Sequence, residues 1–204
     1  MSPRGKLITL EGVDGAGKST HVQFIADTIG AGSRHVVVTR EPGGTDFAEQ
    51  LRKVVLTQTL PPVVVTLIVF AGRGDHVSKV IEPALAAGSS VVCDRFTDAT
   101  IAYQGAGQGV ARELIDELAR EVHPSLVPDR TLIFDVPYEV ASQRLAASGK
   151  KLDRFEREER AFFDRVRNAY LAIAKAEPKR VRLIDASSDP AVIRQAISRE
   201  LAGL

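Results

Sequence analysis

The stretch Leu10–Thr20, LEGVDGAGKST, decides how this sequence can fold. Its segment Gly12–Ser19 matches the phosphate-loop pattern G-x-x-x-x-G-K-[ST] at every fixed position. An apolar segment, Lys6–Leu10, precedes it, and His21–Ile29, with apolar residues at helical spacing, follows it. A strand, a glycine-rich turn and a helix in this order surround phosphate groups with backbone N–H donors. The stretch therefore predicts a nucleotide-binding protein with a parallel sheet.

Two side chains of this loop have specific expected roles. Lys18 adds a positive charge near the β- and γ-phosphates, and the Ser19 hydroxyl is placed to bind Mg²⁺. The alternative, a glycine-rich turn that binds nothing, does not explain the Lys-Ser pair. The residues expected to surround ATP are Gly12, Val13, Asp14, Gly15, Ala16, Gly17, Lys18, Ser19 and Thr20.

Strands alternate with helices along the rest of the chain. This order is typical of a parallel sheet covered on both faces. The expected strands are Lys6–Leu10, Arg34–Thr39, Ser89–Cys93, Thr131–Asp135 and Val181–Ile184. The expected helices are His21–Ile29, Thr45–Leu56, Val63–Ala87, Asp98–Val122, Tyr138–Ala147, Phe155–Ala176 and Pro190–Leu201. The start of the third helix, VVVTLIVF, has strand propensity, and glycines at 105–109 are expected to interrupt the fourth.

Length and composition favour one soluble domain over residues 1–204. The net charge of +1 gives no sign of a nucleic-acid or membrane partner. Cys93 is the single cysteine, which excludes an internal disulfide and fits a reducing cytoplasm. We find neither a secretory signal nor an apolar run long enough to span a membrane.

Polar side chains at two strand ends predict a second anion site beside the phosphate loop. Arg40 follows one expected strand, and Asp94 and Arg95 follow another. Ligands of open α/β sheets bind at the carboxyl ends of strands, where an arginine fork can grip a phosphate twice. Asp94 is placed to orient water on Mg²⁺. The chain lacks an Asn-Lys-x-Asp motif and a strand ending in Asp-Glu, which favours a small-molecule kinase over a GTPase or a remodelling ATPase.

Several motifs together resemble those of the bacterial thymidylate kinase family. They are LEGVDGAGKST, TREPGGT, FAGRGDH, CDRFTDAT and AYQGAGQG, in this order. The resemblance extends from Lys6 to the C-terminal helix. It implies a P-loop kinase fold with three layers, a five-stranded parallel sheet, helices on both faces and a short mobile lid. It also implies transfer of the γ-phosphate of ATP to dTMP with Mg²⁺, in dTTP synthesis, by a homodimer.

The resemblance assigns roles to residues of these motifs. Arg95 resembles the arginine that grips the dTMP phosphate, and Arg73 the one that hydrogen-bonds thymine. Tyr103 resembles the ring under the 2′ carbon of deoxyribose, which excludes ribonucleotides. Thr100 and Gln104 stand where the family contacts the pyrimidine edge.

Three further positions complete the expected acceptor site. Asp14 resembles the carboxylate near the 3′-hydroxyl and the metal, and Arg40 is expected to reach the same crevice as Arg95. The family stacks an aromatic ring on thymine four residues before the base-reading arginine. Here that residue is Val69, so we expect Phe70, one position later, to stack on the base instead.

A lid at about residues 144–156 is expected to supply cations to the transferred phosphoryl group. Because position 15 is glycine, the chain resembles those members that place the catalytic arginines in the lid. The candidates are Arg144, Lys150, Lys151 and Arg154.

Three alternatives remain open from the sequence. One is a kinase for another nucleoside monophosphate. A second is a deoxynucleoside kinase, in which Glu11 acts as the base for a sugar hydroxyl. The third is a P-loop protein without catalytic activity that binds ATP as a switch.

Overall fold

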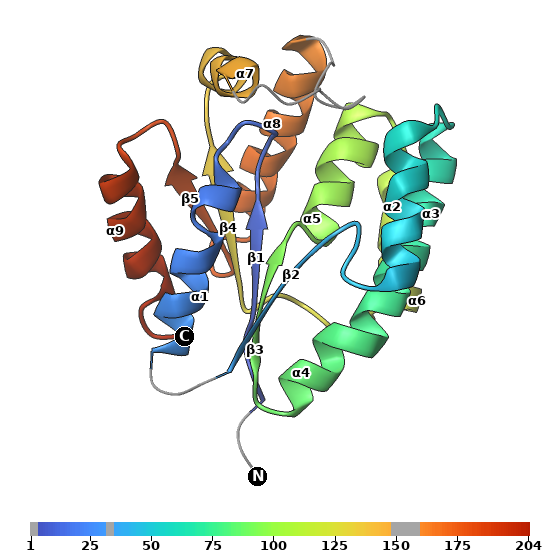
Figure 1. Cartoon of the computed structure of the whole chain (residues 1–204). Helices are drawn as coiled ribbons and strands as arrows, with labels where there is room; N and C mark the ends of the chain where they lie inside the picture. Colours follow the sequence, from blue (N-terminus) through green and yellow to red (C-terminus); the bar gives the residue numbers. More distant parts are fainter. Residues whose placement is uncertain (1–3, 32–34, 148–159) are drawn as a thin grey trace.

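The computed structural model describes residues 4–31, 35–147 and 160–204, and its centre is a five-stranded parallel sheet (Figure 1). The spatial order of the strands is β2-β3-β1-β4-β5. The strands are β1 (Leu7–Glu11), β2 (Val36–Arg40), β3 (Ser90–Asp94), β4 (Arg130–Asp135) and β5 (Val181–Asp185). All five strands expected from the sequence are confirmed, and their ends differ from expectation by at most two residues.

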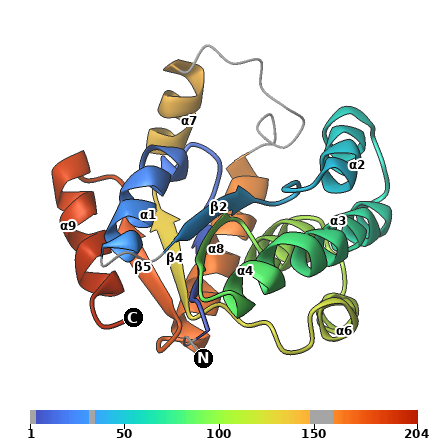
Figure 2. The same ribbon diagram turned by 60° about the horizontal axis from the view of Figure 1, so that its bottom comes forward.

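Helices cover both faces of this sheet. The first part of the chain forms η1 (Lys18–Thr20), α1 (Val22–Gly30), α2 (Asp46–Thr57), α3 (Pro62–His76), η2 (Val77–Ile81) and α4 (Glu82–Ala86). The rest forms α5 (Thr97–Thr100), η3 (Ile101–Gly107), α6 (Arg112–Val122), α7 (Tyr138–Ala147), α8 (Arg160–Ala176) and α9 (Pro190–Leu201). Figures 1 and 2 show α1 and α9 on one face and α3, α4 and α8 on the other.

The strand register brings the functional ends of three strands together. Arg40 of β2 pairs with Asp94 of β3, and Asp94 pairs with Leu10 of β1. Because the strands are parallel, the loops that follow them open at the same edge. The phosphate loop, the segment after Arg40 and the segment after Asp94 therefore surround one region.

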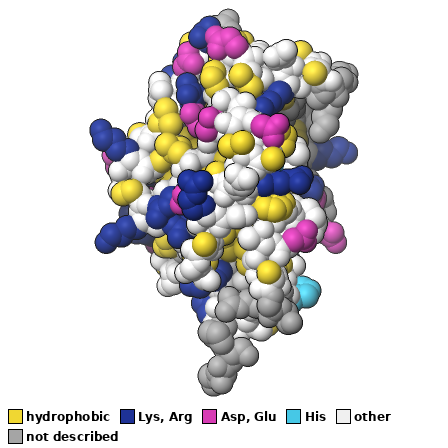
Figure 3. Space-filling model, turned by 90° about the vertical axis from the view of Figure 1, so that its left-hand side faces the viewer, with side chains coloured by type: hydrophobic (Ala, Val, Ile, Leu, Met, Phe, Trp, Pro, Cys, Tyr) yellow, Lys and Arg dark blue, Asp and Glu magenta, His cyan; other side chains and the backbone are white. Residues whose placement is uncertain are grey.

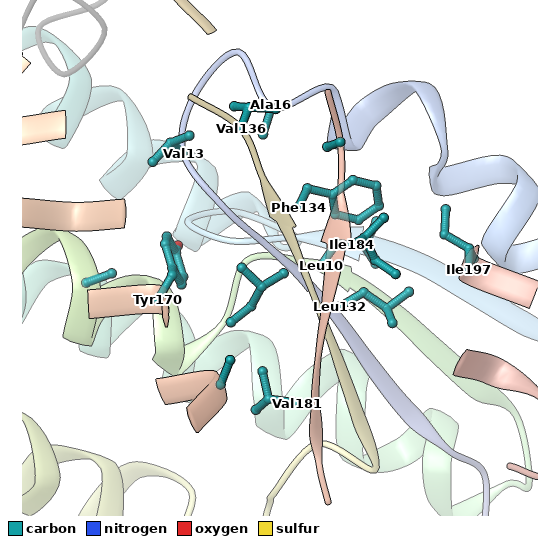
Figure 4. Close-up of a cluster of buried hydrophobic side chains, with 14 of the residues drawn as sticks. Leu10, Val13, Ala16, Leu132, Phe134, Val136, Tyr170, Val181, Ile184 and Ile197 are labelled. Atoms are coloured by element: carbon teal, nitrogen blue, oxygen red, sulfur yellow. The ribbon is translucent and has the colours of Figure 1, made fainter. Parts of the chain in front are cut away.

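The core lies between the sheet and its helices. Every residue of β1 is buried, as expected for a central strand covered on both faces. Figure 4 shows Leu132 and Phe134 of β4 beside Ile184 of β5, with Tyr170 of α8 among the apolar side chains. This packing fixes α8 against the sheet.

Two helical segments compare differently with the expectation from the sequence. The β-branched run after Pro62 is helical, as predicted, because its spacing buries Val65, Val69 and Phe70. The expected interruption at 105–109 is placed too early, because the chain stays helical through Gly107 as the wide π-helix η3 and α6 begins at Arg112. The start of the expected helix Phe155–Ala176 lies outside the described residues.

The surface carries mixed charges. On the face that Figure 3 shows, Lys and Arg side chains are interspersed with Asp, Glu and apolar ones. Among the described residues, the helices are too short or too polar to cross a bilayer.

Candidate active site

The phosphate loop has the conformation that its glycines predict. Gly12, Gly15 and Gly17 all have positive φ angles, of 133°, 81° and 85°. A Cβ atom at Gly12 would lie 2.5 Å from the carbonyl oxygen of Phe134, so a side chain there would displace the loop from β4. Only glycine fits this turn without displacement.

Lys18 spans the loop from its buried position at the start of η1. Its Nζ donates to the carbonyl oxygens of Gly12 at 3.1 Å and Val13 at 3.4 Å. The pKa of Lys18 lies below its usual value, because burial and the nearby Arg95 outweigh the opposing effect of Asp94 and Asp14. The ammonium is thus held at the mouth of the cradle by carbonyl groups that a bound phosphate can replace as partners.

A groove with a volume of about 610 Å³ runs along the loop. Enclosed ligand sites commonly measure roughly 300–1,000 Å³. Gly12 and Val13, which the sequence also predicted for the ATP site, are not among the residues that line it. The predicted residues that line it are Asp14, Gly15, Ala16, Gly17, Lys18, Ser19, Thr20, Arg40, Asp94, Arg95 and Arg144.

A smaller cavity of about 110 Å³ adjoins the groove. The two share Asp14, Glu41, Arg52 and Arg95 as lining residues. Its other polar residues are Arg73, Thr100, Tyr103 and Gln104, all of which the sequence predicted for the acceptor site. Its apolar lining is Pro42, Val55, Leu56, Val69, Phe96 and Ala99.

Arg95 lies where the two cavities meet. Its Nη2 donates to Asp14 Oδ1 at 2.7 Å and to the Tyr103 hydroxyl at 3.0 Å, and that hydroxyl donates to Asp14 Oδ2 at 3.0 Å. Burial opposes the charge on Asp14, but Arg95 and Lys18 outweigh it and lower the pKa of this carboxyl. The result is a charged pair at the boundary, with the guanidinium at the edge of both spaces.

Arg73 is held rigidly in the wall of the smaller cavity. Its Nε donates to Glu41 Oε2 at 2.6 Å, and its Nη2 donates to Thr100 Oγ1 at 3.0 Å. Its side chain is 1% exposed, and its Nη1 has no hydrogen-bond partner among the described residues. A buried donor without a partner is costly, and Arg73 lines the cavity, so Nη1 is a candidate partner for an acceptor bound there.

The expectation that Phe70 stacks on a base is wrong for this geometry. Phe70 is 1% exposed, is absent from the cavity lining and stacks on His123. Its ring lies 4.7 Å from the guanidinium carbon of Arg73, so it supports that arginine from behind. The rotation of α3 that packs Phe70 against Val110 and Ile115 turns Val69 towards the cavity.

The remaining predicted cations are less closely tied to the junction. Arg40 lines the groove with a side chain that is 54% exposed and bonded to Glu49 at 2.9 Å. Arg144 of α7 reaches the groove opposite Gly17. The other candidates, Lys150, Lys151 and Arg154, lie outside the described residues.

Glu41 is the principal site residue that sequence reasoning missed. Its Oε2 accepts the hydrogen bond from Arg73, and its Oε1 is hydrogen-bonded to His76 Nδ1 at 3.0 Å. Burial opposes its charge, but Arg73 and His76 lower the pKa of this carboxyl. The sequence feature that pointed to Glu41 was its position directly after Arg40, at the end of an expected strand.

Glu41, His76 and Cys93 lie close enough together to suggest a metal site, but each already has a partner. His76 Nε2 lies 2.7 Å from Thr39 Oγ1, and Cys93 Sγ donates to a backbone carbonyl. Glu41 and His76 therefore belong to a buried hydrogen-bond network that supports Arg73, and Cys93 bonds to the backbone of Arg95 instead.

Known proteins share this architecture and sequence. The family model described as Thymidylate kinase matches residues 10–197. The chain is 52% identical to a thymidylate kinase of Bordetella petrii over 204 residues, which cover 100% of this chain and 98% of that protein. It is 50% identical to one of Methylobacillus flagellatus, with 95% of each chain covered. The crystal structure of thymidylate kinase from Ehrlichia chaffeensis superposes with a TM-score of 0.78 at 36% identity, covering 97% of this chain and 98% of that one.

Proposed function

Because the chain belongs to the thymidylate kinase family, which phosphorylates dTMP to dTDP using ATP, we propose that it is an ATP-dependent dTMP kinase. The groove along the phosphate loop holds the phosphates of ATP, and the adjoining cavity holds dTMP. The two spaces share Asp14 and Arg95, so the γ-phosphate and the acceptor phosphate meet there.

The unpartnered Nη1 of Arg73 is the observation that carries the acceptor assignment. It is a buried, fixed donor of a residue that lines a cavity with an apolar wall, and a pyrimidine carbonyl bound there would supply its missing partner. Thr100 and Gln104 line the same cavity, and Val69 provides apolar contact in place of an aromatic ring. Tyr103 lies beside Asp14, where its ring excludes a 2′-hydroxyl.

Phosphoryl transfer to a phosphate oxygen needs positioning and charge neutralisation rather than a strong base. Lys18 neutralises the β- and γ-phosphates, and Arg95 exchanges part of its bonding to Asp14 for the acceptor phosphate. Arg40 and Arg144 add positive charge along the groove. These cations hold two polyanions in line and stabilise the charge that spreads over the transferred group.

The oxygen atoms at the groove fit Mg²⁺, which prefers hard oxygen ligands. Asp94 Oδ1 is buried without a hydrogen-bond partner among the described residues, and Ser19 lines the same groove. Both oxygens of Asp14 are engaged by Arg95 and Tyr103, so Asp94 and Ser19 are the principal candidates. Held by Asp94 and Ser19, Mg²⁺ would supply positive charge that offsets the charge on the phosphates of ATP.

The position of Glu11 argues against a deoxynucleoside kinase. Its side chain is fully buried, with one oxygen bonded to the amide of Phe96 and the other to the Tyr170 hydroxyl. It lines neither cavity, so it has no access to a sugar hydroxyl.

We also propose a homodimer in the cytoplasm. Val63, Val64 and Leu67 are 45%, 38% and 46% exposed at the start of α3, and an exposed apolar cluster favours a protein partner. Sedimentation of the wild type and of Leu67→Glu tests the dimer, which the substitution should dissociate.

The lid at about residues 144–156 remains a prediction, because only residues 144–147 of it are described.

A substrate panel tests the proposed function. The protein is incubated with ATP and Mg²⁺ and, in turn, with dTMP, dUMP, UMP, dCMP, dGMP and thymidine, and ADP is measured. We expect fast turnover with dTMP, slower or no turnover with dUMP, and none with the other compounds. Preference for thymidine or a purine nucleotide would contradict the proposal, and ATP binding without ADP formation would indicate a switch protein.

A further inference from the structure

Behind Arg95 lies a buried pair of side chains that neither cavity contains. Glu11 of β1 and Tyr170 of α8 are 0% and 1% exposed, and the Tyr170 hydroxyl donates to Glu11 Oε2 at 2.8 Å. They come from elements 159 residues apart in the sequence, and the ring of Tyr170 sits in the apolar core shown in Figure 4. A buried carboxyl beside a substrate-facing arginine calls for a physical reason, because its burial is costly unless its partners are fixed.

Glu11 fixes the backbone that carries Arg95. Its Oε1 accepts the amide N–H of Phe96 at 2.7 Å. Arg95 has a φ of 70°, in the left-handed region that residues with a side chain rarely adopt. Such a conformation persists only where neighbouring bonds hold it. The bond to Phe96 holds the peptide immediately after this residue.

Tyr170 reaches the other end of the same arginine. Its hydroxyl lies 3.4 Å from Arg95 Nη1, while Nη2 faces Asp14 and Tyr103. The guanidinium is therefore contacted on its inner side by α8 and on its outer side by the residues of the two cavities. We propose that Glu11 and Tyr170 form a positioning pair that holds the backbone and the guanidinium of Arg95 in the orientation that binds the acceptor phosphate.

This inference rests on the proposed function, because it assumes that Arg95 binds the phosphate of dTMP. Neither residue lines either cavity, so we expect the pair to act on dTMP binding through Arg95. Loss of the Tyr170 hydroxyl should therefore weaken dTMP binding, with little effect on ATP. A merely structural hydroxyl would lower stability and leave the KM for dTMP unchanged.

Tyr170→Phe is the main test, because it removes one oxygen and keeps the ring in the core. We expect the KM for dTMP to rise about two- to tenfold, the factor that one hydrogen bond typically contributes. The KM for ATP should stay unchanged and kcat should change less than twofold. Tyr138→Phe, the same change on α7 with its ring against Phe163, is the matched control and should leave both constants unchanged.

A double-mutant cycle shows whether the effect passes through Arg95. Arg95→Ala should itself raise the KM for dTMP, and adding Tyr170→Phe to it should raise the KM no further. An undiminished effect of Tyr170→Phe in the Arg95→Ala protein would overturn the positioning role and leave the proposed function intact. An unchanged KM for dTMP in Arg95→Ala would instead refute the phosphate-binding role of Arg95, and the inference with it.

Glu11 is tested by a graded pair of substitutions. Glu11→Gln keeps an acceptor for the Phe96 amide, whereas Glu11→Leu removes both acceptors. The KM for dTMP should rise more in Glu11→Leu than in Glu11→Gln. If Glu11→Leu does not fold, Tyr170→Phe and Glu11→Gln decide the proposal. Both variants must leave the KM for ATP unchanged. Equal losses for both substrates in either variant would overturn it.

Discussion

Phe70→Ala separates a residue of the core from a residue of the base site. Phe70 is 1% exposed and packed against α6, so its removal leaves a cavity that should cost about 3–5 kcal/mol of unfolding free energy. For a chain of this length, about 1 kcal/mol lowers the melting temperature by about 2–4 °C, so a decrease of about 6–20 °C is expected. Because the ring supports Arg73 and is absent from the cavity lining, the KM for dTMP should rise less than tenfold.

Val69→Ala is the matched control, because Val69 is the preceding residue on the same helix and lines the cavity. Removing two carbon atoms should cost about 1.6 kcal/mol, less than the loss of the Phe70 ring, and any change in KM should concern dTMP rather than ATP. Calorimetric melting and steady-state kinetics on both variants measure the two effects. A Phe70→Ala protein that melts within 2 °C of the wild type, with a KM for dTMP raised tenfold or more, would refute the reasoning and place Phe70 at the base.

Three further outcomes test the rest of the site. Lys18→Ala should abolish turnover and change the melting temperature by less than about 4 °C, because Lys18 contacts the loop carbonyls rather than the core, and activity within a few-fold of wild type would contradict its role. Chelation of Mg²⁺ should abolish phosphoryl transfer and leave dTMP affinity in calorimetry unchanged, whereas a large loss of affinity would place the metal in the acceptor cavity. The pKa of Glu41 is below its usual value when folded, so its contribution to stability is present above the unfolded pKa of about 4.5 and is lost as the pH falls through the folded pKa. Urea unfolding between pH 7 and pH 3 should therefore show a smaller loss of stability in Glu41→Gln than in the wild type, and identical slopes would contradict the assignment.

The sequence by itself determined the architecture and most of the predicted residues that line the two cavities. The pattern from Gly12 to Ser19 requires a strand before it and a helix after it, because the loop binds phosphate only with backbone donors held in that geometry. Alternating strands and helices require a parallel sheet, and a parallel sheet places all strand ends at one edge. Arg40 and Arg95 were therefore predictable as neighbours of the phosphate loop from local patterns alone.

Only the tertiary structure decided which side chains complete the site. Val69 and Phe70 are adjacent on one helix, and packing of α3 against α6 sets the rotation that turns one to the cavity and the other to the core. The bonds from Glu41 to Arg73 and from Tyr170 to Glu11 join residues 32 and 159 positions apart. No local period or spacing encodes such contacts, because they depend on how close the packed elements bring the side chains. If one element were shifted by a single residue, a different side chain would face the partner and the contact would be lost.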